Sequence, residues 1–230
     1  MLVGIHQPHY LPWLRYFEKI ARCDVFIVLD NIQFTKNGWQ NRNKIKSPQG
    51  TTLLTAPVLV KLGDSLDQVQ LNNNTAWRRK HWESIRQCYG TAPYFAEHAD
   101  FLADAYGRDW DRLNDLNRHM LVYFVAALGI KTRIEYASEL QVPGAATERL
   151  VNLVKRVGGN AYYTGAFAVG AYLDPEAFAA AGIALRVQEW QAPTYPQLHG
   201  PFIPDLSVLD LMMNVGPGAL DVLKAGGQWT

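Results

Sequence analysis

The chain has 230 residues, of which 48% are hydrophobic and 19% charged, a composition typical of a globular protein with a substantial core. Its 22 basic residues balance 21 acidic ones, so no surplus of positive charge exists to neutralise phosphates, which argues against a dedicated nucleic-acid-binding protein. The longest apolar run, residues 120–130, is too short to span a bilayer, and the N-terminus lacks signal-peptide features. We therefore expect a cytoplasmic protein without a membrane span.

The N-terminal third begins with a predicted βαβ unit. Residues 2–5 are apolar and predict a buried strand, and Leu14, Phe17 and Ile20 recur at helical spacing, so a helix begins near Pro12 or Trp13. A second apolar strand follows at 25–29. Two strands joined by a helix in this way should be parallel, with a right-handed crossover. The loop that leaves the first strand then lies where open α/β sheets bind ligands, beside a helix N-terminus that favours anions.

A hairpin is expected over residues 39–58, because side chains alternate along residues 39–46, Pro48-Gln49-Gly50 makes a turn, and residues 51–58 are β-branched and apolar. In the first arm, Gln40, Arg42, Lys44 and Lys46 should share one face. A further short strand is expected at 68–71.

Helical periodicity then dominates residues 75–128, in three segments over about 75–88, 94–106 and 111–128. After this region the α/β pattern returns. Strands are predicted at 132–136, 160–163 and 183–189, and helices at 147–157, 175–181, 207–214 and 218–225. The sequence thus predicts one α/β domain over 1–230, with a mixed, largely parallel sheet, a β-hairpin and an inserted all-helical subregion at 75–128.

Three residues form the candidate catalytic group. His6 and His9 lie on the loop after the first strand, and Asp30 follows the second strand at the same edge of the sheet. A carboxylate here can accept a hydrogen bond from an imidazole N–H, which fixes the tautomer and raises the basicity needed to remove a proton. The alternative is that His6 is a buried structural histidine and Asp30 caps a turn.

A second group is basic. Lys36, Asn41, Arg42 and Lys44 collect positive charge and amides on the hairpin near this sheet edge, where they could hold a pyrophosphate or phosphopantetheine-type anion. Edge-strand lysines also protect a sheet against aggregation, which is the alternative interpretation. Tyr163 and Thr164 follow another predicted strand, where their hydroxyls could line the same pocket.

Several known patterns are absent from the sequence. There is no P-loop, no Gly-x-Gly-x-x-Gly after the first strand and no Gly-x-Ser-x-Gly elbow. Two cysteines make no disulfide or metal pattern, and the two loop histidines have only Asp30 as an evident third ligand, so no metal site is predicted.

The sequence resembles the WbqC-like protein family. The resemblance is carried by residues 6–13 (HQPHYLPW), 16–20, 24–26 and 30–34, and by Asn41-Arg42, Ile45-Lys46, Tyr163-Thr164-Gly165, residues 172–174, Tyr195-Pro196 and residues 202–210. Where glycine is expected after the Pro-Trp pair, this chain has Arg15, a further candidate anion contact. The resemblance implies a role in gene clusters for surface polysaccharides and other decorated metabolites, with transfer to amino sugars as the suspected activity.

These observations favour an acyl- or aminoacyl-transferring enzyme that acts on an amine, with a nucleotide sugar as the expected substrate class. His9 or His6, oriented by Asp30, would be the general base, Gln7 and loop N–H groups would stabilise the oxyanion, and Arg42 and Lys44 would hold phosphates. Tyr10 and Trp13 are further candidate binding residues. An activated acyl thioester or ATP is the candidate co-substrate, and an acyl-carrier protein a candidate partner. Two alternatives stay open, a nucleotidyl or adenylyl transferase and a non-catalytic subunit of a glycan-assembly complex.

Overall fold

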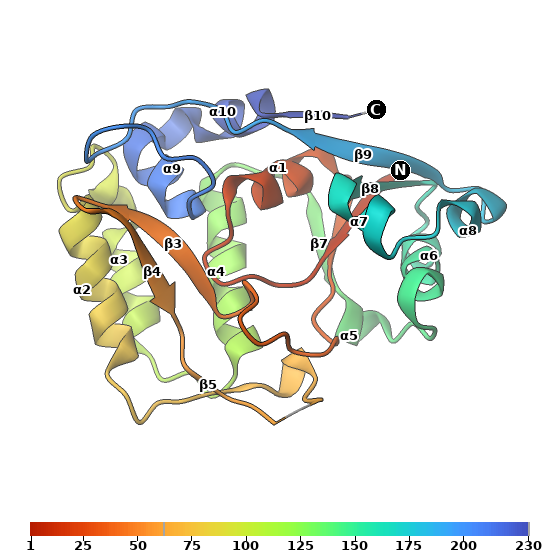
Figure 1. Cartoon of the computed structure of the whole chain (residues 1–230), viewed down its shortest axis with the longest axis horizontal. Coiled ribbons are helices and arrows are strands. Elements are labelled where there is room, and N and C mark those ends of the chain that lie inside the picture. Colours follow the sequence, from red (N-terminus) through yellow and green to blue (C-terminus); the bar gives the residue numbers. More distant parts are fainter. Residues whose placement is uncertain (62, 230) are drawn as a thin grey trace.

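A six-stranded sheet forms the centre of the protein, as seen in the computed structural model, which describes residues 1–61 and 63–229. The strands lie in the spatial order β10-β9-β8-β1-β2-β7 (Figure 1). Their bounds are β1 Leu2–His6, β2 Val25–Val28, β7 Arg133–Tyr136, β8 Ala161–Gly165, β9 Ala184–Trp190 and β10 Gly227–Trp229. All neighbouring strands are parallel except β9 and β10. The predicted mixed, largely parallel sheet is therefore confirmed.

The strand order reverses next to β1. This strand pairs with β2 on one side, with Val3 opposite Val25, and with β8 on the other, with Gly4 opposite Tyr163. From β1 the chain fills the sheet outward through β2 and β7, and then starts again at β8. In open α/β sheets such a reversal leaves a crevice at the carboxyl ends of the two central strands, where ligands bind. His6 lies at that end of β1.

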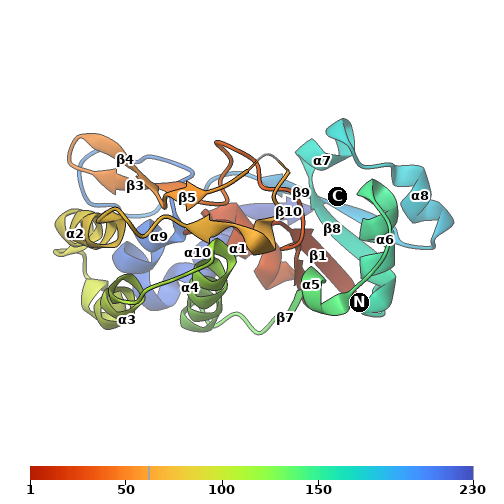
Figure 2. The same ribbon diagram turned by 90° about the horizontal axis from the view of Figure 1, so that it is seen from below.

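Helices cover both faces of the sheet (Figure 2). One face carries α1 (Leu14–Arg22), α4 (Leu113–Ala127), α9 (Val208–Val215) and α10 (Ala219–Ala225), the last two joined by a short 3₁₀ turn at Gly216–Gly218. The other face carries α5 (Ala137–Leu140), α6 (Ala146–Arg156), α7 (Ala166–Ala171) and α8 (Pro175–Ala180).

Two hydrophobic clusters, one on each face, explain why the central strands are apolar throughout. In β2, Phe26 and Val28 belong to the cluster under α1 and α4, whereas Val25 and Ile27 belong to the cluster under α6 and α8. Successive side chains of a strand point to opposite faces, so a strand covered on both sides needs apolar residues at every position.

The hairpin consists of β3 (Arg42–Ser47) and β4 (Gly50–Thr55), so its strands lie within the predicted range of 39–58 but are shorter. The predicted face of Gln40, Arg42, Lys44 and Lys46 does not form a uniform basic surface. Lys46 is fully buried, and its ammonium donates to Gln197 Oε1 and to the carbonyl oxygens of Gly200 and Pro201. The C-terminal segment, which follows β9 from residue 191 onward, covers this end of the hairpin and supplies these acceptors.

Between hairpin and helices, β5 (Val58–Leu59) pairs with β6 (Gln70–Leu71), and a 3₁₀ turn, η1, spans Leu66–Gln68. The predicted helical region contains α2 (Trp77–Tyr89), α3 (Phe95–Gly107) and α4, as expected. Of these, α4 reaches the sheet, and its Phe124 ring lies 6.0 Å from that of Phe17 on α1. The helical region 75–128 is therefore also part of the crossover connection from β2 to β7.

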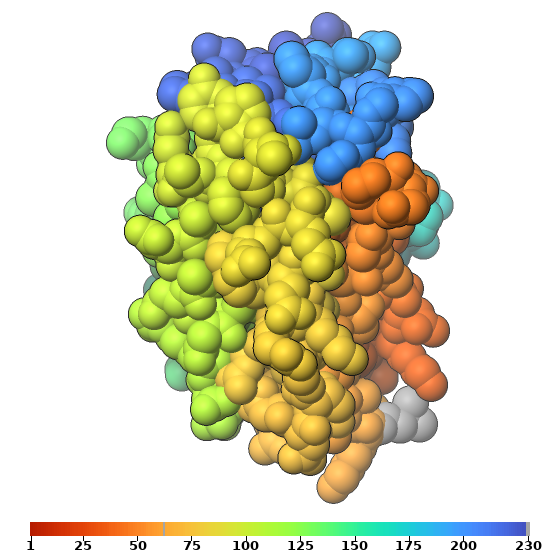
Figure 3. Space-filling model, turned by 90° about the vertical axis from the view of Figure 1, so that its left-hand side faces the viewer, coloured from red at the N-terminus to blue at the C-terminus, as the bar shows by residue number. Residues whose placement is uncertain are grey.

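The C-terminal segment returns across the molecule to the hairpin. Figure 3 shows this segment in blue beside the orange hairpin and the yellow helices α2 and α3. The backbone N–H of Tyr94, before α3, donates to the carbonyl of Met213 on α9. No helix among the described residues is long and apolar enough to cross a membrane.

Candidate active site

The loop from β1 to α1 is held in place along its length by backbone hydrogen bonds. The N–H of Tyr10 donates to the carbonyl of Trp39, and the carbonyl of Pro12 accepts from Val208 N. Asn43 Nδ2 donates to the carbonyl of Leu11, a residue with a left-handed backbone at φ 45°. Two other parts of the chain, residues 39–43 and the start of α9, thus fix the position of the histidines on this loop.

His6 and His9 contact each other, with ring centroids 4.7 Å apart and ring planes nearly perpendicular. His6 Nδ1 lies 3.0 Å from the carbonyl oxygen of Gln7, which can only accept, so Nδ1 carries the proton and Nε2 presents its lone pair. Burial, with Lys19 as the next cause, lowers the pKa of His6 to about 3, and burial with the nearby His6 lowers the pKa of His9. Both imidazoles are therefore neutral at pH 7.

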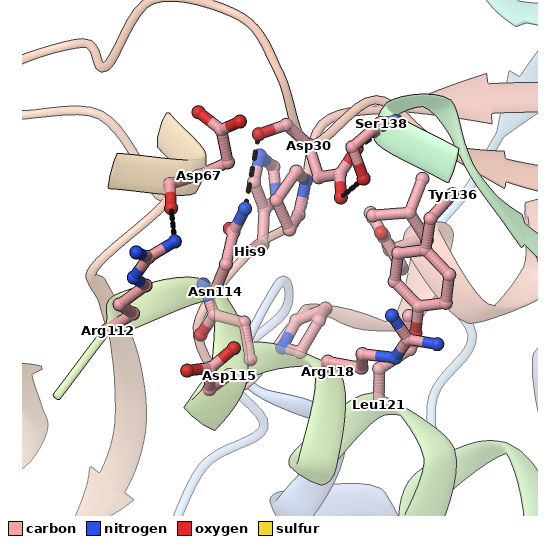
Figure 4. Close-up of a pocket in the computed structure, with 15 residues that line it drawn as sticks. His9, Asp30, Asp67, Arg112, Asn114, Asp115, Arg118, Leu121, Tyr136 and Ser138 are labelled. Carbon is pink, nitrogen blue, oxygen red and sulfur yellow. Dashed lines mark hydrogen bonds between the residues drawn. The ribbon is translucent and has the colours of Figure 1, made fainter. Parts of the chain in front are cut away.

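His9 lines a cavity of about 250 Å³ at the carboxyl ends of β2 and β7 (Figure 4). We call it the His9 cavity. Its wall is formed by Pro8, His9, Pro12, Tyr16, Val28, Asp30, Asp67, Arg112, Asn114, Asp115, Asn117, Arg118, Leu121, Tyr136 and Ser138.

Buried polar atoms without a hydrogen-bond partner concentrate on this wall. Among the described residues, seven such atoms belong to it, namely His9 Nδ1 and Nε2, the hydroxyls of Tyr16 and Tyr136, Asp67 Oδ1, Asn114 Oδ1 and Asn117 Oδ1. Buried polar groups are nearly always hydrogen-bonded, so a cluster of unpaired ones around one hollow indicates a place built for a polar ligand or for ordered water.

Asp30 lines the cavity but does not orient an imidazole. Its carboxylate accepts hydrogen bonds from Ser138 N at 2.9 Å and from Ser138 Oγ at 2.7 Å, as the dashed lines of Figure 4 show. No hydrogen bond joins it to His6 or His9 in the described part of the chain. This corrects the expected geometry. The reason is α5, a helix that the sequence did not predict, whose first turn places an N–H next to the end of β2.

The other residues predicted on the loop have separate surroundings. Gln7 Oε1 accepts a hydrogen bond from Gln40 Nε2. Tyr10 is fully buried away from the cavity, and its hydroxyl is hydrogen-bonded to His81 and Tyr106. The Trp13 ring lies 5.6 Å from the His9 ring. Trp13 therefore remains near the histidine pair, whereas Tyr10 belongs to the core.

The predicted basic group of the hairpin does not join the histidines. Lys36, Asn41 and Arg42 line a separate cavity of about 760 Å³, and Asn41 donates to the carbonyl of Ala56. Lys44 Nζ lies 5.7 Å from the Trp39 ring.

At the end of β8, the Tyr163 hydroxyl donates to the Glu18 carboxylate, and Thr164 is buried. Neither side chain lines the His9 cavity.

The cavity residues that the sequence did not predict come largely from α4. Asn114, Asn117, Arg118 and Leu121 lie at positions i, i+3, i+4 and i+7, which places them on one face of the helix. Three polar side chains on a face turned inward could have been recognised from this spacing. Asp67 and Tyr136 follow no such pattern. Among the described residues, no group of three or more His, Cys, Asp or Glu is placed to hold a metal ion.

Comparisons with known proteins place the chain in a family. The model of the WbqC-like protein family matches residues 7–222. The chain belongs to the WbqC-like protein family. This WbqC-like chain is also similar to the uncharacterized protein Rv1507c of Mycobacterium tuberculosis, with 38% identity over 226 residues that cover 96% of the chain and 97% of that relative. No solved structure matches it at a significant level.

Proposed function

We propose that this WbqC-like protein is an acyl- or aminoacyl-transferring enzyme, and that its acceptor is an amine on an amino sugar bound in the His9 cavity. The observation that carries the proposal is the cluster of unpaired buried polar atoms around His9. A ligand that pairs them must offer several donors and acceptors close together, as the hydroxyl and amine groups of a sugar do.

The shape and composition of the cavity support a sugar ring. Its volume of about 250 Å³ lies below the roughly 300–1,000 Å³ of pockets for drug-sized ligands. Proline and tyrosine rings provide apolar surface for the C–H faces of a sugar. The oxygens of Asp67, Asn114 and Asn117 can accept from its hydroxyls or its amine, and the hydroxyls of Tyr16 and Tyr136 can donate.

His9 supplies the proton acceptor that the reaction requires. The acceptor amine forms a bond to the acyl carbon while a neutral imidazole nitrogen of His9 takes its proton. The bond from the acyl carbon to the thioester sulfur then breaks, and the thiol leaves with that proton. Burial raises the pKa of the Tyr16 phenol, so the hydroxyl stays protonated and can donate to the negatively charged carbonyl oxygen.

The first experiment replaces the proposed base. Purified protein is incubated with acetyl coenzyme A and a panel of amines that includes glucosamine and nucleotide-linked amino sugars, and products are detected by mass spectrometry. His9→Asn is expected to lower the transfer rate by about 100-fold or more, the usual contribution of a general base.

His119→Asn is the matched control, because His119 also has a buried, unpaired Nε2 but lies on α4 against Phe101, outside the His9 cavity. It should retain the wild-type rate. Equal rates in His9→Asn and wild type, or no acylated product from wild type, would contradict the proposal. Release of pyrophosphate from ATP would instead favour nucleotidyl transfer.

A further inference from the structure

Two cations of α1, Arg15 and Lys19, lie close to His6 and His9 but do not line the His9 cavity. Arg15 and Lys19 are four residues apart on the helix and therefore lie on the same face. Lys19 is only 5% exposed. A Cβ atom at Gly165, the last residue of β8, would lie 3.8 Å from Lys19 Nζ, which places the ammonium at the carboxyl end of that strand.

Among the described residues, neither cation has an acidic partner, because no carboxylate lies within 4.0 Å of the Arg15 guanidinium or the Lys19 ammonium. Glu18, the neighbouring acid, is already paired with Arg22 at 2.8 Å and hydrogen-bonded to Tyr163 and Gln188. Burying a charge without a partner is costly, so a buried lysine in this position indicates a missing anion.

The surroundings of the two cations are also suited to an anion. Helix α1 begins at Leu14 without a side-chain cap and without an acidic residue in its first turn, so its N-terminal N–H groups add positive potential. Arg15 stacks over the Trp13 ring, with its guanidinium carbon 4.5 Å from the ring centroid. The site therefore combines a buried ammonium, a guanidinium held on an aromatic face and a helix N-terminus.

We propose that Arg15 and Lys19, with His6 beside them, form a subsite for a phosphate or pyrophosphate group at the reversal point of the sheet. Binding of the anion at this subsite does not depend on the proposed transferase function. Its assignment to the phosphate-bearing part of the acyl donor rests on the proposed function, with the donor at this subsite and the acceptor in the His9 cavity. Both substrates then meet at His6 and His9, whose rings are in contact.

The test uses inorganic pyrophosphate with the full-length protein, and requires no transfer activity. Pyrophosphate should bind in isothermal titration calorimetry and raise the melting temperature, whereas potassium chloride of equal ionic strength should not. Lys19→Met, which keeps the length of the side chain and removes its charge, should weaken binding by at least tenfold. Lys155→Met, an exposed lysine on α6, should bind as wild type does.

Lys19→Met also separates an anion site from a structural role. Without ligand, the variant should melt at or above the wild-type temperature because an unpaired buried charge is gone. A lower melting temperature together with an unchanged affinity for pyrophosphate, or no binding by wild type, would overturn the proposal. Arg15→Met, at an exposed residue, provides a second variant with the same expected loss of binding. If pyrophosphate binds but acyl transfer fails, the subsite stands and the proposed function does not.

Discussion

At the scale of single residues, the two loop histidines are unusual because both are neutral and in contact, and because both ring nitrogens of His9 lack a hydrogen-bond partner among the described residues. Positive charges from Arg15 and Lys19 add to burial in lowering the pKa of each imidazole. A bound anion would offset the effect of those charges and so raise the pKa of both imidazoles, although burial, the larger cause, would remain.

The low pKa of His6 predicts a specific loss of stability in acid. An unfolded histidine takes up a proton near its usual pKa of 6.5, but folded His6 does so only near 3. The unfolded state therefore binds more protons as pH falls from 6.5 towards 3, and stability is lost in that window. Between pH 7 and pH 5 the loss from His6 is about 2 kcal/mol.

Urea unfolding at pH 7 and pH 5 measures this loss. The His6→Asn variant lacks the titrating group, so its free energy of unfolding should fall by about 2 kcal/mol less than that of wild type between the two pH values. An identical fall in both proteins would show that folded His6 titrates near its usual pKa.

At the scale of elements, the short helix α5 determines what Asp30 does. The Asp30 carboxylate caps α5 through Ser138, in the same manner as Asp174 caps α8 by accepting from Glu176 N. The polar face of α4, formed by Asn114, Asn117 and Arg118, supplies another part of the wall of the His9 cavity. One short helix and one long helix thus decide which polar groups face His9.

Replacing Asp30 distinguishes a cap from a partner of histidine. Asp30→Ala should lower the free energy of unfolding by about 0.5–2 kcal/mol, as should Asp174→Ala, the comparison variant. The pKa values of His6 and His9, followed by NMR titration, should not change in Asp30→Ala. A marked fall of either histidine pKa would restore Asp30 as the orienting acid.

At the scale of the whole molecule, the first helix and the last strand are joined. The guanidinium of Arg22 on α1 donates to the carbonyls of Lys224 and Gly227, and the Glu18 carboxylate lies directly against Gly227. A Cβ atom at Gly227 would approach Glu18 Oε1 to 1.9 Å. Glycine is therefore required where β10 closes over α1.

Gly227→Ala should destabilise the protein by about 1–3 kcal/mol, the usual cost of overpacking. Gly170→Ala is the control, because Gly170 lies in α7 and a Cβ atom there would have no neighbour within 4 Å. It should leave stability unchanged or raise it by about 0.5–1 kcal/mol. Thermal and urea unfolding give the free energy of unfolding of each variant. Equal values for the two would show that Gly227 is not closely packed against Glu18 of α1.

The sequence by itself determined the βαβ unit, the apolar strands, the helical region of 75–128 and the histidine loop. These features depend on local periodicity and on short motifs, which act over a few residues. Even so, β10, α5 and α7 escaped prediction, since they are only three to six residues long and short segments carry too little periodicity.

Only the tertiary structure decided which side chains meet. His9 shares its cavity with residues of η1, α4, β7 and α5 that lie 58 to 129 positions further along the chain, from Asp67 to Ser138. Asp30 binds Ser138 in place of a histidine, and Lys36 and Arg42 line another cavity. Strand order and helix docking bring such distant residues together, and both follow from packing across the whole molecule, which no local pattern encodes.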